Sequence, residues 1–233
     1  MKLPSLEQCE KNELAEHEEW VAHSLKSWRE ELANYSPPDL SPRNRDLLMR
    51  LEEAFRKRTC PPRINLLLGG LAEDDYRPPR VIERITATDP TPRNYWPAIT
   101  PELLYACEDA LAYVEPVAFC YLVPAYLRQC LQNPGLGNHT VFYYLCSSDL
   151  TSSKRRVEPL TAAEREIVTH IVNERRCEQL FSETLYDDGL LPWEYDCFLA
   201  EGRDPGDKYA IAEFAEMRAL AYAEESGFLN EES

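Results

Sequence analysis

Histidine and cysteine side chains are the first residues of this sequence to consider for catalysis or metal binding. His17 and His23 are six residues apart, which places them on different faces of a helix, so they lack the spacing of a zinc-binding helix. The eight cysteines form no Cys-x-x-Cys pair and mostly have apolar neighbours, as reduced thiols in a core do. Only Cys177 directly follows a pair of basic residues, Arg175 and Arg176, which could lower its pKa; a half-buried thiol on a helix is the favoured interpretation. We therefore expect no metal ion and no other cofactor.

Neighbouring carboxylates are the second candidate for chemistry, at residues 73–75, 108–109 and 187–188. Acid–base catalysis needs two carboxylates in different environments that face one cleft, and adjacency in the sequence does not supply this. The chain also lacks the glycine-rich phosphate loops and the Gly-x-Ser-x-Gly nucleophile motif. We expect no catalytic residues; an enzyme with an unrecognised helical, metal-assisted site is the alternative to a binding protein.

The negative charge is concentrated near the end of the chain. The net charge is −16, and residues 178–233 contain 15 acidic and 3 basic residues, whereas residues 36–177 contain 18 of each. Nucleic acid and anionic membranes are bound through Lys and Arg, so we expect neither as a partner. Complementary charge favours a basic protein partner instead.

Aromatic side chains lie between the carboxylates of this C-terminal segment, a composition that is typical of protein interfaces. The residues expected to contact the partner are Asp187, Asp188, Trp193, Glu194, Tyr195, Asp196, Glu201, Asp204, Asp207, Glu213 and Glu216. Two ordinary amphipathic helices whose aromatic residues face inward would have the same sequence pattern, so the spacing leaves both arrangements open.

The elements that would position these residues are predicted to be helices. Ser5, Ser41 and Thr161 each have the type and context of a helix N-cap, and Thr161 forms a capping box with Glu164. The last helix is predicted to begin after Asp204 and to end at Gly227. Residues 101–114 read as one helix, whereas residues 63–98 and 139–146 fit a strand or a helix. The expected fold class is all-α, with at most a small vestigial sheet.

The expected organisation is a charged N-terminal helix over residues 1–36, a helical core domain over residues 41–177 and an acidic helical segment over residues 178–233. The longest uncharged apolar stretch has 12 residues, short of the roughly 20 that span a bilayer, and the N-terminus lacks the pattern of a secretory signal. We expect a cytoplasmic protein.

Four segments between residues 45 and 175 resemble a family of bacterial proteins with a domain of unknown function. They are LEEAF at 51–55, ITPELLYACEDAL after Trp96, EPVAFCYLVPAYL at 115–127 and PLTAAEREIVTHIVNE at 159–174. The third is the most specific of these segments. The resemblance implies a compact helical module and brings no assigned activity or catalytic residues.

Together these features favour a cytoplasmic acidic binding protein, of the immunity or antitoxin type, that neutralises a basic toxin such as a nuclease. An enzyme or an adaptor in a larger assembly are the alternatives. The sequence does not indicate an oligomeric state.

Overall fold

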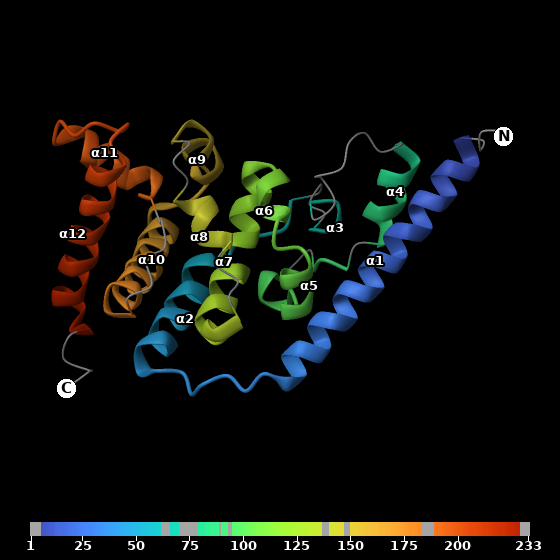
Figure 1. Cartoon of the computed structure of the whole chain (residues 1–233), viewed down its shortest axis with the longest axis horizontal. Coiled ribbons are helices and arrows are strands. Elements are labelled where there is room, and N and C mark those ends of the chain that lie inside the picture. Colours follow the sequence, from blue (N-terminus) through green and yellow to red (C-terminus); the bar gives the residue numbers. More distant parts are fainter. Residues whose placement is uncertain are drawn as a thin grey trace. The chain divides into compact units, whose positions relative to one another are not determined.

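The computed structural model describes residues 6–61, 66–69, 79–88, 90–92, 95–136, 140–146, 150–182 and 189–228. Within these ranges every regular element is a helix, so the predicted all-α fold class is confirmed (Figure 1). The described part of residues 63–98 and residues 140–145, for which a strand was the alternative, are helical or irregular. Across the same ranges, no helix is both long enough and apolar enough to cross a membrane.

The described chain forms two compact units that each combine separate stretches of sequence. Unit 1 contains Met1–Asp39 and Arg58–Asn138, and unit 2 contains Leu40–Lys57 and His139–Ser233. These units divide the chain differently from the three consecutive segments expected from the sequence. The predicted core segment, residues 41–177, contributes to both units, and the acidic C-terminal segment belongs to unit 2.

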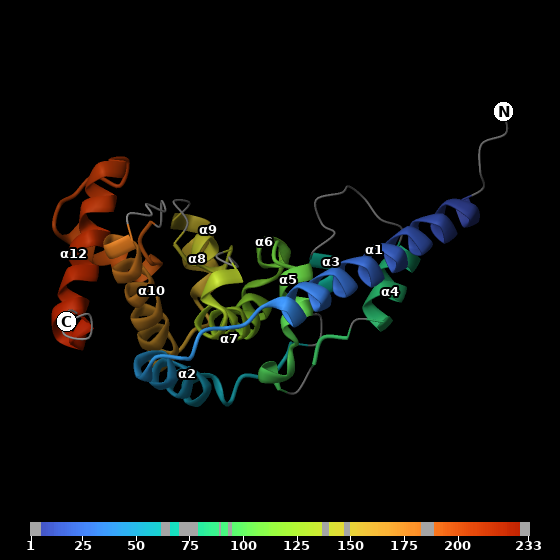
Figure 2. The ribbon, with the colours of Figure 1, turned by 60° about the horizontal axis from the view of Figure 1, so that its bottom comes forward.

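Unit 1 is built around a long first helix and a buried central one. Its elements are α1 (Leu6–Asn34), α3 (Leu66–Gly69), α4 (Pro79–Thr88), η1 (Trp96–Ala98), α5 (Pro101–Ala106), α6 (Ala110–Tyr113), α7 (Pro116–Gln132) and η2 (Pro134–Leu136). Helix α1 lies beside α4 and α5, as Figures 1 and 2 both show. Most side chains of α7 are buried, and this helix continues through Pro124.

The single helix predicted over residues 101–114 is wrong, because the chain leaves helical geometry between α5 and α6. Cys107 has φ −123° and ψ 36°, and its carbonyl oxygen accepts a hydrogen bond from the Tyr126 hydroxyl of α7 at 2.6 Å. This bond joins residues 19 positions apart in a buried environment. A contact of this kind cannot be read from local periodicity.

Unit 2 is a set of helices that pack around α10. Its elements are α2 (Pro42–Phe55), α8 (Thr140–Leu145), α9 (Leu150–Val157), α10 (Ala162–Ser182), α11 (Pro192–Ala200) and α12 (Lys208–Ser226). Helices α2 and α12 both pack against α10, and α9 contacts α8 and α11. The buried apolar residues of α2 and α10 recur at helical spacing, as the sequence predicts.

The helix ends show which cap predictions hold. The Ser41 hydroxyl accepts a hydrogen bond from the Asn44 amide, and Thr161 and Glu164 form the predicted capping box. Gly227 closes α12 with a left-handed φ of 74°. The predicted cap Asp204 is wrong: the carboxylate of Asp207 accepts the amides of the first turn of α12, at 2.9 and 3.2 Å. Asp204 accepts the Gly206 amide within the preceding turn.

Candidate functional site

The C-terminal helix pair, which we define as residues 189–228, contains the described residues of the predicted acidic site. Aromatic rings of α11 and α12 pack together in its core, where Phe198 lies edge-to-face with Phe214 at 5.4 Å between centroids. Tyr222 of α12 packs with Cys177 of α10 in a second buried cluster. Most aromatic residues of this segment therefore face inward, and Tyr209, which is 89% exposed, is the main exception.

A buried ion pair attaches α11 to α10. Arg176 donates to both carboxylate oxygens of Glu194, at 3.1 and 2.9 Å, and to the carbonyl oxygen of Gly189 at 2.8 Å. The Arg176 and Glu194 side chains are only 5% and 3% exposed. The Glu194 carboxylate also caps α11, because it accepts a hydrogen bond from the Leu191 amide at 2.9 Å.

This burial corrects the prediction for two of the expected contact residues. Glu194 is held inside the unit by Arg176, and Tyr195 is 2% exposed with its ring in the helix-pair core. Burial also raises the pKa of Tyr195. Neither side chain is available to a partner, because each is already packed against the protein.

Gly189, at the start of the helix pair, is required by a close approach of two backbone segments. A β-carbon at this position would lie 2.3 Å from the Cys146 carbonyl oxygen. Glycine therefore allows the chain to pass Cys146 and to present its own carbonyl oxygen to Arg176.

A second set of contacts attaches α12 to α10 and α2. Arg43 of α2 lies 3.4 Å from the Glu174 carboxylate and donates to the Ser226 carbonyl oxygen at the end of α12. The Cys177 thiol donates to the Ala219 carbonyl oxygen at 3.2 Å. Burial raises the pKa of Cys177 to about 12, which agrees with the favoured interpretation of a packed thiol on a helix and not with the alternative of an activated one. Desolvation outweighs the nearby guanidinium groups.

The outward face of α12 combines exposed carboxylates with exposed apolar side chains. We call it the α12 stripe; its residues are Tyr209, Glu213, Glu216, Met217, Leu220 and Glu224, all exposed. Their spacing places them within about 100° of the helix circumference, opposite the buried residues Ala215, Ala219 and Tyr222. Of these six, only Glu213 and Glu216 were among the contact residues expected from the sequence.

All of the remaining predicted contact residues that the structure describes are exposed except Trp193, and several have partners within unit 2. Asp196 pairs with Lys154 at 2.6 Å, and Arg203 pairs with Glu201 at 3.1 Å and with Glu213 at 3.2 Å. Asp204 and Asp207 are exposed turn and cap residues, and Glu216 is exposed on α12. Trp193 is half-buried. Asp187 and Asp188 lie outside the described residues.

A hollow of about 290 Å³ lies between the end of α9, the start of α10 and α11. We call it the basic hollow; the charged and aromatic residues that line it are Lys154, Arg155, Glu158, Arg165, Trp193 and Asp196. Three cations face two carboxylates here, although the whole chain carries −16. The hollow was not predicted from the sequence, because the candidate contact residues were chosen mainly by their acidic charge. The run of Lys154, Arg155 and Arg156 was the local signal that could have indicated it.

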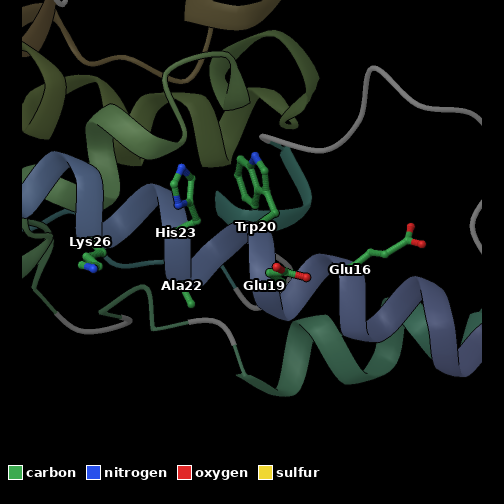
Figure 3. A pocket seen from close by; sticks show the side chains of 6 residues that line it. All are labelled: Glu16, Glu19, Trp20, Ala22, His23 and Lys26. Atoms are coloured by element: carbon green, nitrogen blue, oxygen red, sulfur yellow. The ribbon is translucent and has the colours of Figure 1, made fainter.

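A shallower hollow of about 560 Å³ runs along α1, and its six lining residues all belong to that helix. Figure 3 shows the Trp20 indole and the His23 imidazole extending to the same side of α1, while Glu16 extends away along it. His17 is buried and stacks against Trp20. One helix supplies a surface for contact, but not opposing walls that would hold a substrate between acid and base.

The other candidate residues do not assemble into a catalytic or metal centre in the described part of the chain. No group of three His, Cys, Asp or Glu side chains there is placed to hold a metal ion. Burial and the neighbouring Asp109 raise the pKa of Glu108, which lies at the break between α5 and α6. The carboxylates at 73–75 and His139 lie outside the described residues.

The chain belongs to a family of unknown function, DUF6714, whose model matches residues 43–181. The predicted resemblance to an uncharacterised domain family is therefore confirmed. The match begins in α2 and ends in α10, so α1 and the C-terminal helix pair lie outside it. No curated protein and no solved structure matches the chain.

Proposed function

We propose that this chain is an acidic binding protein that docks on a basic protein partner through the α12 stripe. The observation that carries the proposal is the composition of the stripe, in which three large apolar side chains lie beside three glutamates on one exposed helix face. Apolar side chains supply contact energy in an interface, and surrounding carboxylates guide a basic surface toward it. The partner surface would therefore be apolar with a border of Lys or Arg.

The charge of the whole helix pair supports the same class of partner. Residues 189–228 contain nine acidic and three basic residues, and one of the nine, Glu194, is buried with Arg176. Exposed carboxylates repel the phosphates of nucleic acid and attract cationic proteins. The field reaches about 8–10 Å at physiological salt, so association should weaken as salt is raised.

The more specific form of the proposal is a cytoplasmic immunity or antitoxin-type protein that covers a basic toxin. A nuclease suits this role because the groove that holds its nucleic acid must be basic. An adaptor that uses the same stripe within a larger assembly is the second candidate. The two differ in what the partner does, and both require a basic partner.

The first test is purification of the tagged full chain from its native cytosol at low and moderate salt, followed by mass spectrometry. We expect one stoichiometric basic protein at low salt and less of it at moderate salt. If that protein is a toxin, adding the purified chain should inhibit its activity. Recovery of the chain alone at both salt concentrations would contradict the proposal and favour the enzyme alternative.

Variants of the stripe identify the surface. Replacing Glu213, Glu216 and Glu224 together by Gln should remove the salt-sensitive part of binding, and replacing Tyr209 and Leu220 by Ser should remove the apolar part. These side chains are exposed, so we expect the fold to be retained.

The matched control replaces three exposed glutamates of α1, Glu7, Glu16 and Glu18, by Gln, which removes the same charge elsewhere. Equal loss of the partner by this control would show that net charge, and not the stripe, determines binding. Unchanged binding by both stripe variants would exclude the stripe as the docking surface.

A further inference from the structure

The basic hollow contains two guanidinium groups that lack a carboxylate partner among the described residues. Lys154 is paired with Asp196 at 2.6 Å, but no carboxylate of the described chain lies within ion-pair distance of Arg155 or Arg165. Arg165 donates only to a backbone carbonyl oxygen there, that of Glu158 at 3.2 Å. Its Nε atom is buried and has no hydrogen-bond partner in the described part of the chain.

An indole ring forms a fixed wall of the same hollow. Trp193 donates from Nε1 to the Thr169 hydroxyl at 2.9 Å, and that hydroxyl donates to the Arg165 carbonyl oxygen at 2.8 Å. The Arg165 guanidinium lies 5.8 Å from the centroid of the Trp193 ring. The aromatic surface and the cation are thus held beside one another by α10 and α11.

These groups define the chemistry of a ligand. Guanidinium groups bind carboxylate and phosphate oxygens through paired hydrogen bonds, and an indole offers a flat apolar surface to another ring. The volume of about 290 Å³ lies at the lower limit of small-molecule pockets, which are roughly 300–1,000 Å³. It therefore suits a ligand of about one ring.

We propose that the basic hollow binds a small organic anion with a flat ring. The carboxylate or phosphate of the ligand faces Arg155 and Arg165, and its ring lies against Trp193. Lys154 contributes less, because Asp196 already neutralises it. This site is independent of the α12 stripe, since the two surfaces use different residues and opposite charge.

The test uses defined one-ring probes and the full chain labelled with ¹⁵N. Benzoate and phenyl phosphate carry the two anionic groups, benzamidine carries a cation on the same ring, and benzyl alcohol is neutral. The Trp193 indole NH signal is assigned with Trp193→Phe. We expect a saturable shift of this signal with at least one of the two anions and none with benzamidine or benzyl alcohol. Comparison of the two anions distinguishes a carboxylate from a phosphate site.

Charge variants then locate the anion within the hollow. Arg155→Gln and Arg165→Gln should each weaken binding about tenfold, because a hydrogen bond to a charged group is lost. Asp196→Asn should strengthen it several-fold, since Lys154 is released from its partner. Arg84→Gln, which removes an exposed arginine of α4 in unit 1, should leave affinity unchanged.

Three results would overturn the proposal. The first is a Trp193 signal that neither anion shifts at up to about 10 mM, a concentration at which even a site with a Kd of about 1 mM would be mostly occupied. The second is equal binding of benzamidine, which would make the hollow merely apolar. The third is unchanged affinity in Arg155→Gln and Asp196→Asn; both positions are exposed, so these variants stay interpretable even if Arg165→Gln fails to fold.

Discussion

Removal of the Glu194 carboxylate should destabilise unit 2 far more than removal of an exposed acid. In Glu194→Ala, Arg176 loses both of its hydrogen bonds to this carboxylate, and the Leu191 amide loses its acceptor. Removing one member of a buried ion pair costs about 3–5 kcal/mol. Since a folded domain has about 5–15 kcal/mol of stability in total, this single change should remove a large share of the free energy of unfolding.

Urea denaturation of the full chain, followed by circular dichroism, measures this cost. The matched control is Glu213→Ala, because Glu213 also faces an arginine, Arg203 at 3.2 Å, but with its side chain 68% exposed. An exposed ion pair contributes about 0–1 kcal/mol, so the control should lose no more than that.

A double variant separates the ion pair from simple packing. Arg176→Met with Glu194→Leu removes both charges and fills similar volume, so it should cost clearly less than the sum of the two single changes. A Glu194→Ala loss below about 1 kcal/mol, or additive costs in the double variant, would refute the assignment of this pair as the attachment of α11 to α10.

Two further predictions test the corrections that the structure makes to the sequence analysis. Asp207→Ala should lower the free energy of unfolding by about 1 kcal/mol, because two amides of α12 lose their cap. Asp204→Ala should lower it by only a few tenths of a kcal/mol. The reverse order in urea denaturation would contradict the cap assignment. Iodoacetamide at pH 8 should modify the exposed Cys197 and spare Cys177, whose pKa is raised to about 12, as read by peptide mass spectrometry; equal modification in the folded protein would contradict the burial of Cys177.

Local signals predicted most of the helices but not their interruptions or partners. The Ser41 and Thr161 caps were found because a cap and its amide are only three residues apart. The break between α5 and α6 was missed, since the Cys107 carbonyl is engaged by Tyr126 from another helix. Long-range contacts of this kind override the helical preference of the sequence.

The sequence indicated the negative charge of the C-terminal segment but not which of its acids are buried. Glu194 was selected with the other acids, but its partner Arg176 lies 18 residues earlier, so pairing could not be inferred from spacing. The position of Glu194 three residues after Leu191, at the start of a helix beginning with Pro192, was a signal that it serves as a cap. Tyr209, Met217 and Leu220 were not selected, because the expected contact residues were chosen mainly by their carboxylates and not by the outward face of α12.

The attachment of the helix pair bears on how the α12 stripe would bind. The stripe occupies the outer face of a helix whose inner face is packed through Ala219 and Tyr222 onto Cys177 of α10. The packing of the helix pair on the rest of unit 2 does not depend on a partner. Arg176 holds α11, and Arg43 holds the end of α12. A preorganised surface loses little conformational entropy on association, so more of the contact energy appears as affinity. The buried ion pairs of α10 and α2 would then serve recognition indirectly, by fixing the orientation of a surface that they do not touch.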